Sequence, residues 1–216
     1  MKKWKMLVCV LAMLPAVPFA KADYVSSGGG FGIGAQYWNM SDLSDVYDGG
    51  GMWGGAFTIR LRPLKYIGVD LRTGFMWTQC DYLKLCDRYA KDDRLWNVPL
   101  EAGVVVTYPI GDVLMLYGGG GVGYYIYGES AEILEQVGQR RVWTDTDIEL
   151  ENDVGWFAVA GINLRLGEGA SLVVEGRYTS TQIALKHPEE YTDGNNSYGD
   201  SDASGFGAQI GFMFGY

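Results

Sequence analysis

The sequence predicts an all-β protein, an eight-stranded antiparallel up-and-down transmembrane β-barrel. Three observations predict this fold class: a last strand with one large apolar face, the same alternation in seven earlier segments, and connections that are alternately short and long. The apolar face of the last strand is formed by every second residue: Phe206, Ala208, Ile210, Phe212, Phe214 and Tyr216. A period of two indicates a strand, and large apolar side chains opposite small or polar ones are typical of a strand exposed to lipid.

Residues 1–22 have the features of a secretory signal peptide. Lysines near the start precede a short apolar run, and small residues stand three and one positions before Asp23. A membrane-spanning helix is disfavoured because the apolar run is short and is interrupted by Pro15 and Pro18. We therefore expect export, cleavage after residue 22, and a single mature barrel domain over residues 23–216.

Eight segments alternate, and each reaches the ~9–11 residues that a tilted strand needs to cross a bilayer. They are residues 29–40, 52–62, 66–78, 95–108, 113–127, 154–166, 171–183 and 206–216. The last strand needs a partner for its outer edge, and pairing with the first strand would close the sheet.

The connections between these segments alternate in length. Three are short (63–65, 109–112 and 167–170) and four are long (41–51, 79–94, 128–153 and 184–203). Short turns on the periplasmic side and long loops outside are typical of barrels in an outer membrane. We expect two short helices in the long loops, over residues 82–90 and 131–137.

The charged residues within the strands all fall on the face opposite the apolar one. They are Arg60, Arg62, Asp70, Arg72, Glu101, Arg165, Glu175 and Arg177. An arginine on the lipid face near the midplane would cost ~2–4 kcal/mol, which gives this placement a physical reason. Inside a barrel of eight strands we expect these charges to pair, with glycines, Tyr117, Tyr125 and Phe157 filling the remaining space and leaving no diffusion pore.

Each strand also carries an outward aromatic residue near its long-loop end. These residues are Tyr37, Trp53, Trp77, Trp96, Tyr124, Trp156, Tyr178 and Phe206. Aromatic residues gather in this way where a barrel meets the membrane–water interface.

Two cysteines follow residue 22, Cys80 and Cys86. An even number of cysteines in an exported chain favours a disulfide, although a reduced pair is the alternative. The spacing of five residues between them is not that of a metal site.

This pattern resembles the small bacterial outer-membrane barrels of the OmpA/OmpX type, a porin-like family, over essentially the whole mature chain. The resemblance is carried by the last strand and by the segments 116–125 and 172–178. It implies a location in the cell outer membrane of a Gram-negative type of cell. It also implies insertion by the barrel assembly machinery, which would read Phe212, Phe214 and Tyr216.

Charge is concentrated in the long connections. Removal of residues 1–22 takes four lysines and changes the formal net charge from −9 to −13, all of it in the four connections. The third, residues 128–153, is the most acidic. An acidic rim argues against nucleic acid as a partner. It predicts a solvated, repulsive surface or, alternatively, the recruitment of cationic partners or of divalent cations that bridge to lipopolysaccharide phosphates.

The sequence thus predicts a monomeric outer-membrane barrel with a plugged interior and a structural or surface-interaction role. The expected partners are outer-membrane lipid, lipopolysaccharide, the assembly machinery and an unidentified surface partner. We expect no catalytic residue, cofactor or metal site. The letters Gly118-x-Gly120-x-x-Gly123 fit a dinucleotide motif, but they lie within a strand and open no helix. There the glycines would instead leave room under the inward tyrosines.

Two alternatives remain. An outer-membrane lipid A esterase would use a Ser-His-Glu set, for which His187 with Glu189, Glu190 and Ser197 is the available group. A soluble periplasmic lipocalin-like barrel would bind an apolar ligand inside. It requires apolar residues inward and charged residues outward.

Overall fold

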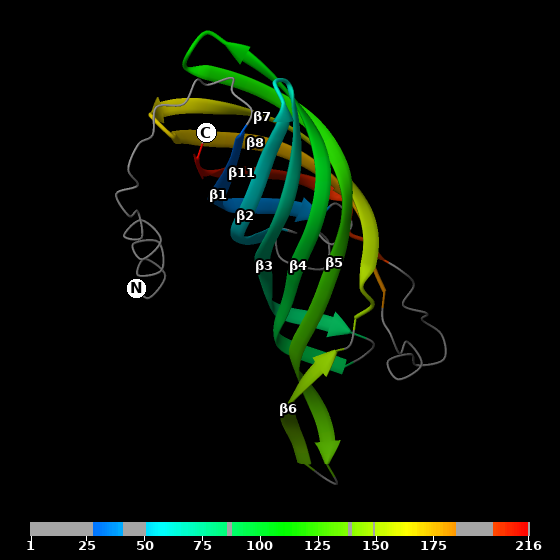
Figure 1. Ribbon diagram of the computed structural model, residues 1–216. Coiled ribbons are helices and arrows are strands. Elements are labelled where there is room, and N and C mark those ends of the chain that lie inside the picture. Colours follow the sequence, from blue (N-terminus) through cyan, green and yellow to red (C-terminus); the bar gives the residue numbers. More distant parts are fainter. Residues whose placement is uncertain are drawn as a thin grey trace.

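A computed structural model describes residues 28–40, 51–85, 88–137, 140–148, 150–184 and 201–215. Eight long strands form the barrel (Figure 1). They are β1 (Gly28–Met40), β2 (Gly51–Leu64), β3 (Ile67–Leu85), β4 (Arg88–Ile110), β5 (Leu114–Val137), β7 (Asp153–Gly167), β8 (Ala170–Ser180) and β11 (Gly205–Phe214). Three short strands complete the sheet structure: β6 (Arg140–Ile148), β9 (Gln182–Ile183) and β10 (Ser201–Asp202). The predicted signal peptide, Cys86 of the predicted Cys80–Cys86 bridge, His187 with its three neighbours, and Tyr216 lie outside the described residues.

The sheet closes on itself with every pair antiparallel. β11 pairs with β1 from Phe31↔Phe214 to Met40↔Gly205, and β4 pairs with β5, so each of the eight barrel strands has two neighbours. Closure removes the free edges, which explains why the apolar last strand is stable at the surface of the wall. The eight-stranded up-and-down fold predicted from the alternation is confirmed.

The strands close with a stagger that can be followed through the register. Starting at Gly29 of β1, successive pairs run through Leu61, Val69, Val104, Gly120, Ala158, Tyr178 and Phe206, and return to β1 at Asn39. The path therefore returns ten residues further along β1. Such a stagger tilts the strands by ~35–45° and leaves an interior about wide enough for the side chains.

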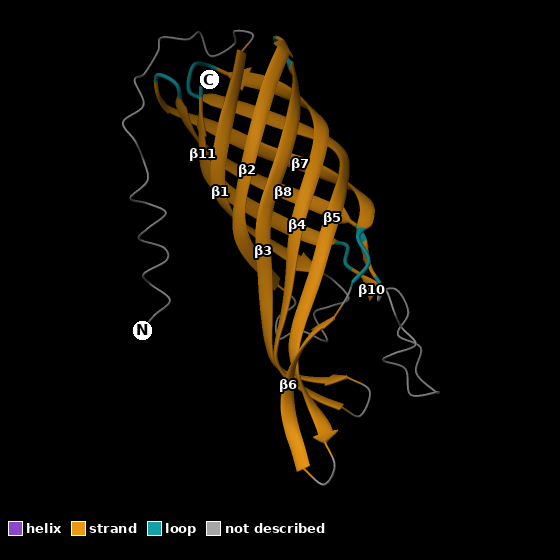
Figure 2. Cartoon of the chain, turned by 60° about the horizontal axis from the view of Figure 1, so that its bottom comes forward, coloured by secondary structure: helices purple, strands orange, loops and turns teal. Residues whose placement is uncertain are grey.

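The strands β3, β4 and β5 continue past the barrel on the side opposite the short turns (Figure 2). β3 and β4 pair as far as Leu85↔Arg88, and β5 then pairs with β6. The helices predicted over residues 82–90 and 131–137 are therefore wrong, and most of the predicted connections 79–94 and 128–153 is strand. The ladder of the barrel supplies backbone partners for each added residue, and this outweighs a weak local helical preference. Within the described residues, no helix is long and apolar enough to cross a membrane.

Apolar side chains face outward and charged ones inward. Phe206 is 71% exposed and Trp53 is 62% exposed, whereas Arg60 and Asp70 are buried. A soluble protein has the reverse arrangement, because lipid, unlike water, favours apolar surface. The alternative of a soluble lipocalin-like barrel requires apolar side chains inward and charged ones outward, and it is therefore wrong.

The inward glycines allow close approach of neighbouring strands. A Cβ built on Gly161 would lie 2.6 Å from the ring of Tyr117, and one on Gly123 would lie 2.7 Å from the Tyr125 hydroxyl. These two glycines do leave room for inward tyrosines. Gly118 does not, because its nearest neighbour would be the Val159 carbonyl oxygen at 3.7 Å.

Alanine at Gly121 is expected to destabilise the barrel by about 1–3 kcal/mol, because overpacking of this size carries that cost. The new Cβ would clash with the Ala102 carbonyl oxygen and lie 2.5 Å from the Gly103 Cα, so β4 and β5 would have to separate. Gly176→Ala is the matched control, since its nearest neighbour lies 3.9 Å away. Denaturant unfolding of the two variants measures the difference. Equal stability of both would contradict the close approach.

Candidate functional site: the barrel interior

Four charged side chains form one buried network at the centre of the interior. The guanidinium of Arg60 donates to both oxygens of Asp70, with Nε–Oδ1 at 2.6 Å and Nη2–Oδ2 at 2.7 Å. Arg72 donates to Asp70 Oδ2 at 2.7 Å and to both oxygens of Glu175, including Oε2 at 2.8 Å. Paired geometry of this kind offsets the cost of removing charges from water.

This network crosses the interior. Arg72 lies on β3 and Glu175 on β8, which are four strands apart in the closed order and therefore on opposite walls. The Tyr117 hydroxyl of β5 donates to Glu175 Oε2 at 2.7 Å. Three walls thus meet at one carboxylate, and the ion pair ties the two sides of the barrel together.

A second cluster is centred on Glu101 of β4. Arg177 of β8 and the Tyr125 hydroxyl both donate to its Oε1, the latter at 2.9 Å. Arg177 also donates from Nε to Thr179 Oγ1 at 3.3 Å. All the charges of both clusters are buried. Their attraction is therefore screened by water much less than it would be at the surface.

Aromatic rings separate and cover these charges. Arg60 lies over the Tyr117 ring at 4.1 Å, and Phe157 lies between Arg72 at 5.9 Å and Arg177 at 5.7 Å. Such contacts are favourable because the face of an aromatic ring is electronegative. Phe157 therefore links the two charge clusters.

A pair of aromatic rings spans the interior nearer the long-loop end. Trp38 of β1 and Tyr125 of β5 stand on opposite walls, and their ring centroids are 6.1 Å apart. Met40, Met52 and Leu95 are buried at this end. The side chains here meet across the full width of the barrel.

Apolar side chains line more of the interior than we expected from the sequence. One buried cluster, which extends from the centre to the turn end, consists of Val105, Met115, Tyr117, Phe157, Val159, Val173 and Met213. All five methionines of the described residues are buried. The signal was present in the sequence, because Met52, Met76, Met115 and Met213 fall on the face opposite the large apolar residues of their strands. Methionine fills irregular gaps well, which suits a staggered interior.

The structure brings six of the eight predicted interior charges together in the two clusters. Arg62 is buried nearer the short-turn end and donates from Nη1 to Met115 Sδ at 3.7 Å. Arg165 is half-buried beside a short turn and donates from Nε to the Gly167 carbonyl oxygen at 3.2 Å. The alternation predicted the facing of these residues but not their partners.

The predicted interface aromatics lie on the outer wall, and several contact one another across neighbouring strands. Tyr37 meets Trp53 at 4.4 Å, and Tyr178 meets both Trp156 at 5.4 Å and Phe206 at 5.0 Å. Phe75, which we did not predict as an interface residue, stacks on Trp96 at 6.3 Å and contacts Trp77 in a tilted arrangement at 5.9 Å. At the opposite end Phe214 contacts Phe31 at 5.4 Å, and Phe212 is half-buried.

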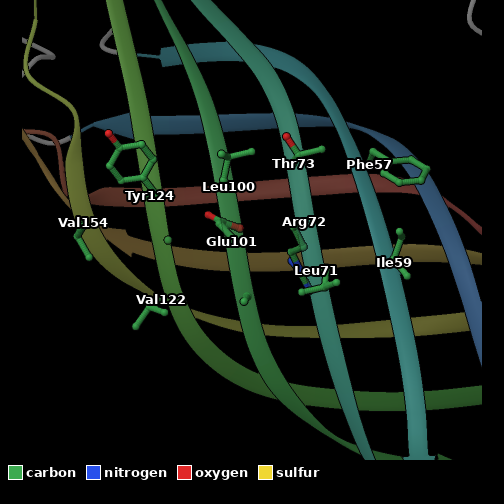
Figure 3. A pocket seen from close by; sticks show the side chains of 12 residues that line it. Phe57, Ile59, Leu71, Arg72, Thr73, Leu100, Glu101, Val122, Tyr124 and Val154 are labelled. Atoms are coloured by element: carbon green, nitrogen blue, oxygen red, sulfur yellow. The ribbon is translucent and has the colours of Figure 1, made fainter.

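The outer wall has a shallow hollow, which Figure 3 shows from close by. It holds about 530 Å³ and lies where the small side chains of Thr73 and Ala102 are surrounded by Phe57, Leu71 and Leu100. Its lining is almost entirely apolar, as a lipid-facing wall requires. Among the residues that the structure describes, no group of three or more His, Cys, Asp and Glu side chains is placed to hold a metal ion.

Comparison with known proteins gives the family. The profile of a family described as outer membrane protein β-barrel domain matches residues 6–214. The chain belongs to this family. Membership of the outer membrane protein β-barrel family implies a location in the outer membrane. No curated protein matches the chain.

Several solved structures of outer-membrane barrels are similar in fold. OprG of Pseudomonas aeruginosa is 15% identical, with a TM-score of 0.58 over 89% of this chain and 97% of that chain. Ail of Yersinia pestis is 13% identical, with a TM-score of 0.46 over 88% and 98% of the two chains. Neisserial surface protein A is 11% identical, with a TM-score of 0.48 over 88% and 98%. At these identities the likeness to OprG supports the fold alone.

Proposed function

We propose that this member of the outer membrane protein β-barrel family is a plugged barrel with a structural or surface-interaction role and no catalytic activity. The observation that carries the proposal is the ion pair between Arg72 and Glu175, which joins opposite walls of the barrel. Because this ion pair bridges the centre of the barrel, the interior is poorly suited to pass solutes. A structural or surface-interaction role is favoured instead.

Three levels of the interior support the plug. Trp38 and Tyr125 meet across it near the long-loop end, the two charge clusters fill the centre, and the apolar cluster fills the turn end. Beside Arg60, Arg72, Tyr117 and Glu175, a void of about 10 Å³ remains. A void of that size holds about one water molecule.

Purified protein in a planar lipid bilayer is expected to show no stable conductance, because a plugged barrel offers no continuous water path. The variant Trp38→Ala/Tyr125→Ala removes the ring contact near the long-loop end and the hydrogen bond from Tyr125 to Glu101, but none of the central ion pairs. It is expected to remain closed as well, since the central ion pairs persist. Regular conductance steps from the unmodified protein would contradict the plugged interior.

The other predicted features belong to the same proposal. The outward aromatics would anchor the barrel at the interface, and the last strand with Phe212, Phe214 and Tyr216 would be read by the assembly machinery. Lipid and lipopolysaccharide would surround the wall, and the acidic connections would meet a cationic partner or bound divalent cations. A signal peptide over residues 1–22 and a Cys80–Cys86 bridge would fit export through an oxidising compartment.

The surface role is supported by the extension of β3, β4, β5 and β6 beyond the barrel, away from the short turns (Figure 2). Its test is labelling of intact cells that carry Thr144→Cys, with the parent protein as control. A membrane-impermeant thiol reagent is expected to label the variant in excess of the parent. Absence of this excess would overturn the surface role.

A further inference from the structure

The extension ends in the strand β6, and among the described residues only one of its two edges is paired. β6 pairs with β5 along its full length, from Glu129↔Ile148 to Val137↔Arg140, without a register shift. It has no second strand neighbour among the described residues. The free edge therefore presents nine residues of backbone in regular strand geometry.

Free edges usually carry features that prevent pairing with another chain, such as charged side chains, proline, a bulge or a very short length. The sequence of β6, Arg-Arg-Val-Trp-Thr-Asp-Thr-Asp-Ile, contains neither proline nor glycine. Valine, tryptophan, threonine and isoleucine are all residues that favour strands. This edge therefore has strand-forming residues and no proline or bulge, and its four charged residues restrict pairing to a strand of complementary charge.

The charges of β6 are complementary to those of a second β6 strand that runs antiparallel to the first. Arg140 and Arg141 stand at its start, and Asp145 and Asp147 stand towards its end. In an antiparallel pair of two β6 strands centred on Thr144, Arg141 lies opposite Asp147 in both halves. A parallel, in-register pair would place like charges opposite each other, which is destabilising.

We propose that β6 pairs antiparallel with β6 of a second copy of this chain. The inference rests on the proposed surface-interaction role and names its partner. The occupant follows from the charge order, because a second β6 places an aspartate opposite Arg141 and an arginine opposite Asp147, whereas an arbitrary strand does not.

The orientation of the barrel decides where the second copy lies. Within one membrane every copy has the same orientation, and Figure 2 shows the extension continuing the tilted strands of the wall. With a tilt of ~35–45°, a twofold axis along the membrane normal sets two copies of β6 at about 70–90° to each other. Antiparallel pairing instead requires a twofold axis between two facing membranes. The contact therefore joins copies on apposed outer membranes.

Two charge variants test this pairing without disturbing the hairpin. Arg140→Asp/Arg141→Asp makes the charges of β6 wholly acidic, and Asp145→Arg/Asp147→Arg makes them wholly basic. The β5 residues opposite the first pair are Val137 and Gln136, and those opposite the second are Glu132 and Ser130. Neither variant therefore creates a like-charge pair with β5.

The experiment measures clustering of vesicles that carry the full mature protein, by the rise in turbidity. Vesicles with unmodified protein are expected to cluster, and each charge variant alone is expected to cluster about tenfold more slowly, because like charges then face each other. A mixture of the two variants pairs acidic with basic strands and is expected to return within about twofold of the unmodified rate.

Clustering unaffected by the variants, or a mixture that fails to recover, would overturn the inference. A gel shift between boiled and unboiled samples verifies that each variant is folded. The labelling of Thr144→Cys separates this failure from failure of the proposed function. If intact cells are labelled but vesicles do not cluster, the surface role stands and the pairing is wrong. If cells are not labelled, both are wrong.

Discussion

Arg72→Met is expected to lower the free energy of unfolding of the barrel by about 3–5 kcal/mol, the cost typical of breaking a buried ion pair by removing one partner. Arg72 contacts two carboxylates, Asp70 and Glu175, and all three side chains are buried. Without the guanidinium of Arg72, Glu175 keeps the hydrogen bond from the Tyr117 hydroxyl but loses its ion pair. Denaturant unfolding of barrels refolded into vesicles, read from the gel mobility of folded and unfolded forms, measures the loss.

Two further variants make this result specific. Arg165→Met removes an arginine that is only half-buried beside a short turn, and is expected to cost less than about 1 kcal/mol. Arg72→Met/Glu175→Met replaces the whole pair by apolar side chains and is expected to regain most of the loss, because no uncompensated carboxylate remains. Two outcomes would refute the role of the Arg72–Glu175 ion pair. One is an equal loss of unfolding free energy in Arg72→Met and Arg165→Met, and the other is a double variant less stable than Arg72→Met.

Val104→Arg is expected to impair insertion and to destabilise the barrel by about 2–4 kcal/mol, because it places a charge on the lipid face near mid-depth. Val104 is 51% exposed on the outer wall. It lies six residues before the end of β4 at Ile110. That separation is about 20 Å along a tilted strand, which places Val104 near the middle of the hydrocarbon layer.

Ile110→Arg is the matched control on the same strand and the same face. Ile110 is similarly exposed, at 45%, but lies at the short-turn end of the strand. Its cost is expected to be about 0–1 kcal/mol, because arginine near the interface reaches water and lipid head groups. The fraction inserted into vesicles and the free energy of unfolding measure both variants. Equal penalties at the two positions would contradict the depth assigned to β4 in the membrane.

Of the two variants with the largest expected effects, one could be chosen from the sequence and the other only from the structure. The choice of Val104 follows from alternation in the sequence, since charges and large apolar residues occupy opposite faces of each strand. The choice of Arg72 requires the structure, because Arg72 and Glu175 are 103 residues apart in the chain. Five arginines and three carboxylates on one face allow many pairings, and the alternation does not select among them.

The sequence by itself determined the fold class, the number of barrel strands and the facing of their side chains. It could do so because a period of two distinguishes a strand, and because lipid and a narrow polar interior select opposite kinds of residue for its two faces. The tertiary structure alone decided which residues meet inside and how far the strands extend. The stagger of ten residues brings Trp38 to Tyr125 and Arg72 to Glu175. The ladder of the barrel carries β3, β4 and β5 through segments whose local sequence favoured helices, because each added pair satisfies backbone groups that a short isolated helix would leave open.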